Sequence, residues 1–238
     1  MSSNKKIFRH EFKYFINYHE YEILRRRLSL IMGYDSNVLS KNQYHVRSLY
    51  FDNFKNSGIF EKQSGILQRK KYRIRIYNLE KNIIKLERKE RVGQFIRKYS
   101  SLLSYTDCQK IIDGDIICLK ESNNKLQNSF YADLRSENYR PSVIVDYFRE
   151  PLTYRHGNVR VTFDKNLKSG LYQTSLFDKD LKMVRVIEEP QLIMEVKYDN
   201  YLPDIIRNAI QIPSSTRYAI SKFVICRKYT KLNSWEDN

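Results

Sequence analysis

Residues 69–77 read Arg-Lys-Lys-Tyr-Arg-Ile-Arg-Ile-Tyr, and their alternation predicts a β-strand. One face of this strand carries only cations, namely Arg69, Lys71, Arg73 and Arg75. The other face is mainly apolar, with Tyr72, Ile74 and Ile76 preceded by Lys70. Four cations spaced two residues apart repel one another unless an anion or neighbouring carboxylates lie opposite them. The stretch therefore indicates a polyanionic ligand.

The composition agrees with an anionic partner. The chain has 238 residues, of which 43 are Lys or Arg and 27 are Asp or Glu, giving a formal net charge of +16. This excess points to nucleic acid, an anionic membrane or a phosphate-rich ligand. Three cysteines lack a metal-site spacing, and the sequence contains neither a secretory signal nor an apolar run of about 18 residues. We therefore expect a cytoplasmic protein with reduced thiols.

Hydrophobic periodicity predicts an α+β fold. Strands are expected over residues 7–16, 44–51, 69–77, 83–89, 95–99, 143–149, 159–164 and 192–198. Helices are expected over residues 18–32, 106–119, 125–134, 203–210 and 215–229, with Thr106 as an N-cap. Because no flexible linker separates these segments, we expect a single domain over residues 1–238, with its core at about 7–230 and a polar tail at 233–238. The sheet is expected to be largely antiparallel, with about eight strands and flanking helices.

Five of the predicted strands each have one face on which cations accompany an occasional carboxylate. These residues are Arg9, Glu11 and Lys13; Arg73 and Arg75; Lys85, Glu87 and Lys89; Arg160 and Asp164; and Glu195 and Lys197. In a closed barrel the charged faces would line a positive lumen, whose carboxylates could hold a divalent metal. In an open sheet they would face water while helices cover the apolar side. The alternation alone leaves both arrangements open.

Several familiar catalytic motifs are absent from the sequence. There is no Gly-x-x-x-x-Gly-Lys phosphate loop, Gly-x-Gly-x-x-Gly turn, His-Glu-x-x-His zinc helix or Gly-x-Ser-x-Gly elbow. The four histidines are scattered, which favours structural or surface roles. A cationic site without an obvious nucleophile still suits phosphoryl transfer, because positioning and charge supply most of the catalysis there.

Eight short motifs occur in the order seen in VTC domains. They are Glu11-Phe12-Lys13-Tyr14, Ser48-Leu49-Tyr50-Phe51-Asp52, Lys71-Tyr72-Arg73-Ile74-Arg75, Leu86-Glu87-Arg88-Lys89, Tyr147-Phe148-Arg149, Val159-Arg160-Val161-Thr162-Phe163-Asp164, Met194-Glu195-Val196-Lys197 and Ser221-Lys222-Phe223. Over about residues 7–228 the chain thus resembles the VTC domains, the polyphosphate polymerase branch of the CYTH-like triphosphate tunnel metalloenzymes.

The resemblance implies a closed antiparallel tunnel barrel that binds ATP and Mn²⁺ or Mg²⁺. Such a domain transfers the γ-phosphate of ATP onto a growing polyphosphate chain. By position, the implied phosphate-binding cations are Lys13, Arg73, Arg75, Lys89, Lys98, Arg149, Arg160 and Lys222. Tyr147 and Ser221 match hydrogen-bond donors, and Glu195 matches the metal-binding carboxylate. Glu11 and Glu87 are either further metal ligands or groups that orient the cations.

Two positions depart from the pattern of the relatives. Many triphosphate tunnel enzymes begin with Glu-x-Glu-x-Lys, whereas Arg9 here precedes Glu11 and Lys13, which disfavours triphosphatase and cyclase activities. The polymerase type also has a lysine three residues before the position of Lys222, where this chain has Ala219. Arg217, which we expect on the same helix, would have to serve in its place as a substrate-binding residue.

Three functional hypotheses therefore accompany that of an ATP-dependent polyphosphate polymerase. They are a non-catalytic binding domain or sensor for polyphosphate or phosphate, a tunnel-type triphosphatase and, more remotely, a nucleic-acid-binding protein. We expect ATP and polyphosphate as partners and no nucleic acid. Because relatives often work with membrane proteins, the resemblance also implies a membrane-protein partner, which would place the protein at the inner face of a membrane.

Overall fold

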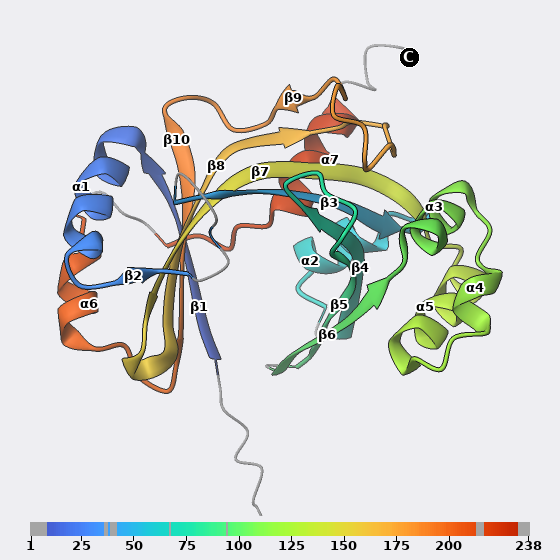
Figure 1. The fold of residues 1–238 in the computed structure, drawn as a ribbon, viewed down its shortest axis with the longest axis horizontal. Helices are drawn as coiled ribbons and strands as arrows, with labels where there is room; N and C mark the ends of the chain where they lie inside the picture. Colours follow the sequence, from blue (N-terminus) through green and yellow to red (C-terminus); the bar gives the residue numbers. More distant parts are fainter. Residues whose placement is uncertain are drawn as a thin grey trace, which may run out of the picture. The chain divides into compact units, whose positions relative to one another are not determined.

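The computed structural model describes residues 9–35, 38, 42–66, 68–93, 95–212 and 217–232 (Figure 1). Its strands are β1 Arg9–Asn17, β2 Gly33–Tyr34, β3 Tyr44–Asp52, β4 Gln68–Tyr77, β5 Ile84–Val92, β6 Phe95–Leu103, β7 Arg140–Tyr154, β8 Val159–Ser169, β9 Val184–Arg185 and β10 Gln191–Asp199. Its α-helices are α1 Tyr18–Ser29, α2 Ser57–Gln63, α3 Tyr105–Asp113, α4 Ile117–Lys120, α5 Lys125–Ser136, α6 Asp204–Ala209 and α7 Lys222–Leu232, and a 3₁₀ turn spans His156–Asn158.

The strand order confirms the predicted fold class. Eight strands follow one another in the order β1-β10-β8-β7-β3-β4-β5-β6, while β2 pairs with β7 and β9 pairs with β8. Each pairing whose register is known is antiparallel. The chain is therefore an α+β protein with an antiparallel sheet of about eight principal strands.

The chain forms two compact units. The β1 unit comprises Met1–Tyr44, Tyr147–Leu167 and Ile187–Ile220. The β4 unit comprises His45–Asp146, Lys168–Val186 and Ser221–Asn238. The strands β7 and β8 contribute residues to both.

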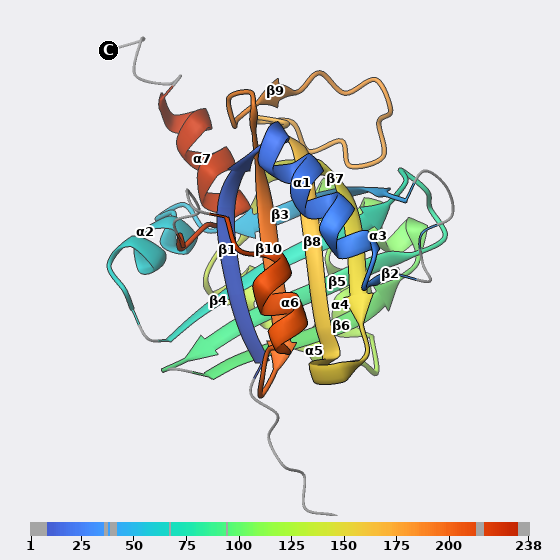
Figure 2. The same ribbon diagram turned by 90° about the vertical axis from the view of Figure 1, so that its left-hand side faces the viewer.

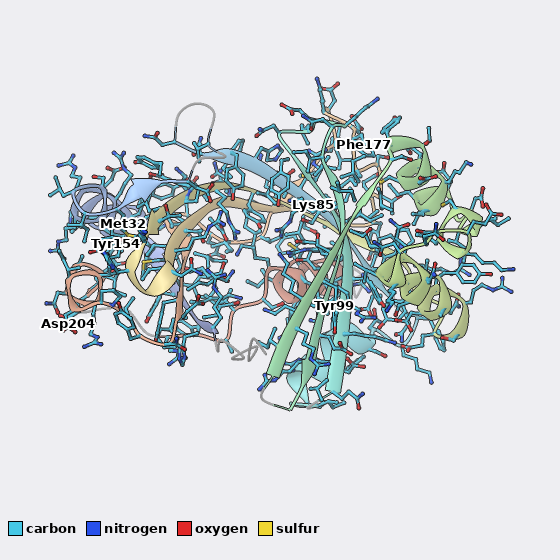
Figure 3. The ribbon with its side chains drawn as sticks, turned by 60° about the horizontal axis from the view of Figure 1, so that its bottom comes forward. Met32, Lys85, Tyr99, Tyr154, Phe177 and Asp204 are labelled. Carbon is cyan, nitrogen blue, oxygen red and sulfur yellow. The ribbon has the colours of Figure 1, made fainter. Side chains whose placement is uncertain are left out.

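In the β1 unit, helices cover the apolar face of the sheet that β1, β10, β8 and β7 form in that order. Asn17 caps α1: its side chain accepts a hydrogen bond from the Glu20 backbone N–H, and the Glu20 carboxylate accepts one from the Asn17 N–H, each at 2.8 Å. Figure 2 shows α1 and α6 lying across β1, β10 and β8. Leu24 and Leu28 of α1 are fully buried in this core, which also contains Met32 and Tyr154 (Figure 3).

In the β4 unit, the apolar side of the stretch at residues 69–77 faces a hydrophobic core, as its alternation predicts. Tyr72, Ile74 and Ile76 are completely buried. The ring of Phe130 on α5 lies 4.6 Å from the Tyr72 ring and 5.0 Å from the Phe51 ring. The cations Arg69, Lys71, Arg73 and Arg75 lie on the opposite side of β4.

The structure corrects the prediction of one long helix over residues 106–119. Here α3 ends at Asp113, because Gly114 adopts the left-handed conformation at φ 95°, and α4 is a separate turn. The N-cap is Ser104 rather than Thr106, since the Ser104 hydroxyl accepts a hydrogen bond from the Asp107 N–H at 3.0 Å. A glycine with positive φ is favoured just after the last residue of a helix, and Gly114 ends α3 in this way.

A second correction concerns the helix expected over residues 215–229. The helix α7 begins only at Lys222, whereas Arg217 forms a β-bridge with Tyr14 and the Tyr218 N–H donates to the Lys13 carbonyl at 3.0 Å. Pairing with the backbone of β1 therefore holds this segment extended, and Arg217 does not lie on the helix of Lys222.

Some boundaries also differ from the prediction. The expected short strand at residues 95–99 continues to Leu103 as β6, and β7 extends well beyond 143–149 in both directions. The predicted polar tail at 233–238 lies outside the described residues. In the part of the chain that is described, no helix is both long enough and apolar enough to cross a membrane.

Candidate functional site

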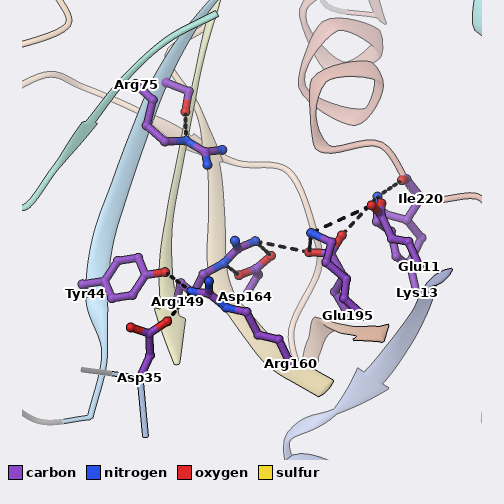
Figure 4. A network of polar contacts seen from close by, with 12 residues as sticks. Glu11, Lys13, Asp35, Tyr44, Arg75, Arg149, Arg160, Asp164, Glu195 and Ile220 are labelled. Atoms are coloured by element: carbon purple, nitrogen blue, oxygen red, sulfur yellow. Dashed lines mark hydrogen bonds and ion pairs between the residues drawn. The ribbon is translucent and has the colours of Figure 1, made fainter. Parts of the chain in front are cut away.

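The charged face of the β1 unit centres on two carboxylates that share two lysines (Figure 4). Lys13 lies directly opposite Glu195 in the β1–β10 register, and Glu11 lies opposite Lys197. The Lys13 ammonium is 2.7 Å from Glu11 and 3.6 Å from Glu195. The Lys197 ammonium is 3.1 Å from Glu195 and 3.9 Å from Glu11. Lys13 also donates a hydrogen bond to the Ile220 carbonyl at 3.1 Å.

Lys197 shows that these carboxylates do not fully offset the burial of the cations. Burial lowers the pKa of Lys197 to about 8, although Glu195 and Glu11 act in the opposite direction. An additional anion on this face would stabilise the charged ammonium.

A buried ion pair lies beside this cluster. The Arg149 guanidinium on β7 donates two hydrogen bonds to Asp164 on β8, at 2.6 and 2.7 Å, and lies 3.5 Å from Glu195 (Figure 4). Burial lowers the pKa of Arg149, but Asp164, Tyr147 and Glu195 together outweigh this effect and the pKa is raised overall. The two-pronged contact fixes the plane of the guanidinium. The ring of Tyr147 lies beneath it, 5.3 Å from the Arg149 Cζ.

Arg160 is held separately on the same unit. Its guanidinium is 2.9 Å from the Asp35 carboxylate and 3.0 Å from the Tyr44 hydroxyl. Arg160 lies opposite Lys197 in the β8–β10 register. Of the sequence-predicted residues, the β1 unit thus brings Glu11, Lys13, Tyr147, Arg149, Arg160 and Glu195 to neighbouring strands.

Glu11 and Glu195 are the carboxylates of this face that could hold a divalent metal together with a bound phosphate. Mg²⁺ is commonly bound through one or two carboxylates together with substrate phosphate oxygens. The Thr162 hydroxyl, opposite Glu195 in register, is buried and has no hydrogen-bond partner among the described residues. The described residues contain no group of three or more His, Cys, Asp or Glu side chains suited to a metal. A metal here would therefore depend on the bound phosphate for its coordination.

The charged face of the β4 unit centres on one buried carboxylate, Glu87. Its oxygens lie 2.6 Å from Arg73 Nε, 2.7 Å from Lys98 Nζ and 3.7 Å from Arg75 Nη1. Arg73 also donates to the Tyr50 hydroxyl at 2.7 Å, and Arg75 donates to the Ser48 hydroxyl at 3.1 Å. Burial raises the pKa of Glu87, but the three cations outweigh it and lower the pKa strongly. Glu87 thus contacts all three cations, where the resemblance implies either a metal ligand or a group that orients cations.

Tyr50 lies at the same centre, although it is not among the predicted site residues. Burial raises the pKa of Tyr50, yet the charges of Arg73 and Arg75, with Lys222, outweigh burial and the pKa is lowered. The Phe223 ring is 5.1 Å from the Tyr50 ring. The alternation through Ser48 and Tyr50 is the signal that could have placed this hydroxyl on the charged face.

Three lysines of the β4 unit form a row across three strands. Lys71 of β4 lies opposite Lys89 of β5, which in turn lies opposite Lys98 of β6. The Lys71 ammonium is 4.6 Å from the centre of the Phe223 ring. Lys222 begins α7, and Ser221 precedes it, its carbonyl accepting a hydrogen bond from Ile225. The predicted cations Lys89 and Lys98 thus share a face with Arg73 and Arg75.

Arg217 is not brought to either charged face. Its guanidinium stacks on the Phe12 ring, 3.5 Å from the ring centre. Phe12 alternates with Glu11 and Lys13 on β1, so it points to the opposite side of the sheet. The structure therefore gives no support to Arg217 as a replacement for the lysine that the polymerase type has at the position of Ala219.

Glu87→Gln is expected to destabilise the protein at neutral pH and to flatten its acid denaturation. Because folding lowers the pKa of Glu87 below its ordinary value of 4.5, its stabilising contribution is present above that pH and is lost as the pH falls below it. Urea unfolding should show wild type more stable by at least about 2 kcal/mol at about pH 7, and this difference should shrink by about pH 3. The control is Glu80→Gln, an exposed residue, for which little change is expected. A difference that stays constant across this range would contradict the role of Glu87.

Comparison with known structures supports the α+β fold of this chain. A putative adenylyl cyclase from Hippeastrum, described as having a dominant triphosphatase activity, shares the fold at 12% identity and a TM-score of 0.51, covering 93% of this chain and 96% of that one. A putative adenylate cyclase from Bacillus halodurans is 13% identical, with a TM-score of 0.47 and 84% of each chain covered. No protein with a curated description is detectably similar in sequence.

The sequence matches the VTC domain over residues 8–231, and the chain belongs to this family. The family expected from the eight ordered motifs is thereby confirmed. At such low identity, the structural neighbours bear on the fold alone.

Proposed function

We propose that this protein is an ATP-dependent polyphosphate polymerase. The observation that carries the proposal is the pair of charged strand faces, on which guanidinium and ammonium groups surround a few buried carboxylates. Such groups bind phosphate oxygens without attacking them. This is the requirement of phosphoryl transfer, in which the protein contributes positioning and charge.

In the proposed reaction, a terminal oxygen of polyphosphate attacks the γ-phosphorus of ATP. A new P–O bond forms, the bond from the γ-phosphorus to the β–γ bridging oxygen breaks, and ADP leaves with that oxygen. Polyphosphate gains one unit, so atoms and charge balance. Arg73 and Arg75, oriented by Glu87, hold phosphate oxygens in pairs, and Arg149, oriented by Asp164, does the same. The other phosphate-binding groups are Lys13, Lys89, Lys98, Arg160, Lys222, Tyr147 and Ser221.

Glu195 and Glu11 would hold the divalent metal, Mn²⁺ or Mg²⁺. When bound, the ion neutralises charge on the phosphate oxygens. In its absence, Lys13 and Lys197 neutralise the same two carboxylates. A metal held by the carboxylates would take over this neutralisation, and the two ammonium groups would then turn toward phosphate.

A second candidate is a non-catalytic domain that binds polyphosphate. The placement of Arg217 on Phe12 favours it, because neither Ala219 nor Arg217 then supplies the cation that the polymerase type has at this position. Triphosphatase activity, attributed to the Hippeastrum neighbour, is less favoured because Arg9 stands where hydrolytic relatives have a carboxylate. In either polyphosphate function we infer a cytoplasmic protein that meets a membrane-protein partner at the inner face of a membrane.

The test is incubation of the full chain with ATP, Mn²⁺ or Mg²⁺, and a short polyphosphate primer. We expect a ladder of polyphosphate on a stained gel, and its loss in Glu195→Gln. Asp204→Asn, a change in an exposed ion pair, is the control and should leave the ladder unchanged. Binding of polyphosphate without any chain growth, under every metal and primer tried, would replace the polymerase by the binding domain.

A further inference from the structure

Two arginines beyond the candidate site lie directly opposite each other on neighbouring strands. Arg69 of β4 pairs in register with Arg91 of β5. Both are half-buried, and both alternate onto the face that carries Arg73 and Glu87. Like charges placed directly opposite across two strands are destabilising. The pair is therefore an energetic cost that folding alone does not explain.

The contacts of the two arginines offset little of this cost. Arg69 donates to the Glu61 carbonyl at 3.4 Å, and Arg91 donates to the Gly93 carbonyl at 2.8 Å. Neither forms an ion pair with a carboxylate of the described residues. Burial and the Arg91 charge lower the pKa of Arg69, and Glu61 compensates only in part. Each guanidinium thus retains donors for an anion.

The pair continues a series of cationic rows along the same face. The first row contains Arg73 opposite Glu87, the second contains Lys71, Lys89 and Lys98, and the third is Arg69 opposite Arg91. Two residues of a strand span roughly 7 Å, so Arg69 lies about 13 Å along β4 from Arg73. Rows at this spacing match a linear anion with regularly repeated charges better than a compact one.

We propose that Arg69 and Arg91 form an outer subsite that binds phosphates of a polyphosphate chain whose end lies at Arg73 and Arg75. This inference rests on the proposed function, because it assumes that the same face binds polyphosphate. A triphosphate held at Arg73 does not extend to the outer row, whereas a longer chain passes the row of Lys71 and reaches it. The subsite therefore makes affinity depend on chain length.

The test compares wild type with the double variant that carries both Arg69→Gln and Arg91→Gln, using two ligands. Calorimetry on the full chain is done with tripolyphosphate and with long-chain polyphosphate, and the ratio of variant to wild-type Kd is taken for each ligand. We expect a loss of about tenfold or more for the long chain and less than about twofold for tripolyphosphate. A long chain can bind in more positions than a short one. This statistical factor is the same for variant and wild type, so it cancels in each ratio of Kd values.

The matched control is Lys110→Gln with Arg135→Gln, which removes two exposed cations from α3 and α5. It should alter neither ratio by more than about twofold.

The Arg69 and Arg91 variant should melt no lower than wild type, since it removes a repulsion, and each single variant should show part of the long-chain loss. Equal losses for both ligands, or the same loss in the control, would overturn the outer subsite. If wild type binds tripolyphosphate and the variant keeps its long-chain affinity, only the subsite fails; if wild type binds neither ligand, the proposed function fails with it.

Discussion

Arg73→Ala combined with Arg75→Ala is expected to weaken tripolyphosphate binding by at least about a hundredfold. Each guanidinium offers charge-assisted hydrogen bonds to phosphate, and such bonds contribute about 1.5–3 kcal/mol apiece. The two side chains lie around Glu87, at 2.6 and 3.7 Å, so one ligand can meet both. The measurement is calorimetric titration of the full chain at fixed ionic strength.

Two controls separate this effect from charge and from folding. Lys110→Ala with Arg135→Ala removes the same charge from exposed helical positions and should change the affinity little. Adding Glu87→Gln to the Arg73 and Arg75 variant removes a carboxylate that has lost two of its partners, and should recover stability without recovering binding. If both double variants lose affinity equally, with a strong dependence on salt, binding is a surface effect of the kind a nucleic-acid-binding protein shows.

Asp164→Asn is expected to cost about 3–5 kcal/mol of unfolding free energy. The substitution removes the charge partner of a buried guanidinium, and breaking one side of a buried pair leaves the other charge uncompensated. Asp164 is fully buried and accepts both hydrogen bonds of Arg149. Urea unfolding should show a lower midpoint at an unchanged slope. The variant should also lose tripolyphosphate affinity, because Arg149 is no longer held in plane.

Asp204→Asn is the matched comparison for this prediction. Asp204 pairs with Arg207 at 2.6 Å, but both side chains are largely exposed. Exposed pairs contribute about 0–1 kcal/mol. If the two Asp→Asn variants are destabilised equally, the buried pair of Arg149 and Asp164 stabilises the fold no more than an exposed ion pair does.

Strand faces were predictable from the sequence because the side-chain period of a strand is two. The alternation over residues 69–77 correctly separated the buried Tyr72, Ile74 and Ile76 from the cations. Strand register was not predictable, because it depends on pairing between distant segments. The row of Lys71 with Lys89 and the opposition of Arg69 to Arg91 became visible only in the folded chain.

Tertiary contacts also overrode local helical preference. Residues just before Lys222 carry a helical pattern, yet Arg217 and Tyr218 bind the backbone of β1 instead. The prediction of Arg217 as a substrate-binding residue therefore relies on a helix that does not extend that far. The role of Asp164 is not predictable from its strand alone, because its two-pronged contact with Arg149 requires the β7–β8 pairing.

The most direct test of the polymerase proposal follows the phosphorus atoms of ATP by ³¹P NMR with the full chain, Mg²⁺ and a primer. We expect the γ-phosphate signal of ATP to decline while ADP and internal polyphosphate signals grow in equal amounts. Orthophosphate should not accumulate. Release of orthophosphate in step with ADP would instead indicate a triphosphatase, and unchanged ATP with demonstrable polyphosphate binding would contradict polymerisation.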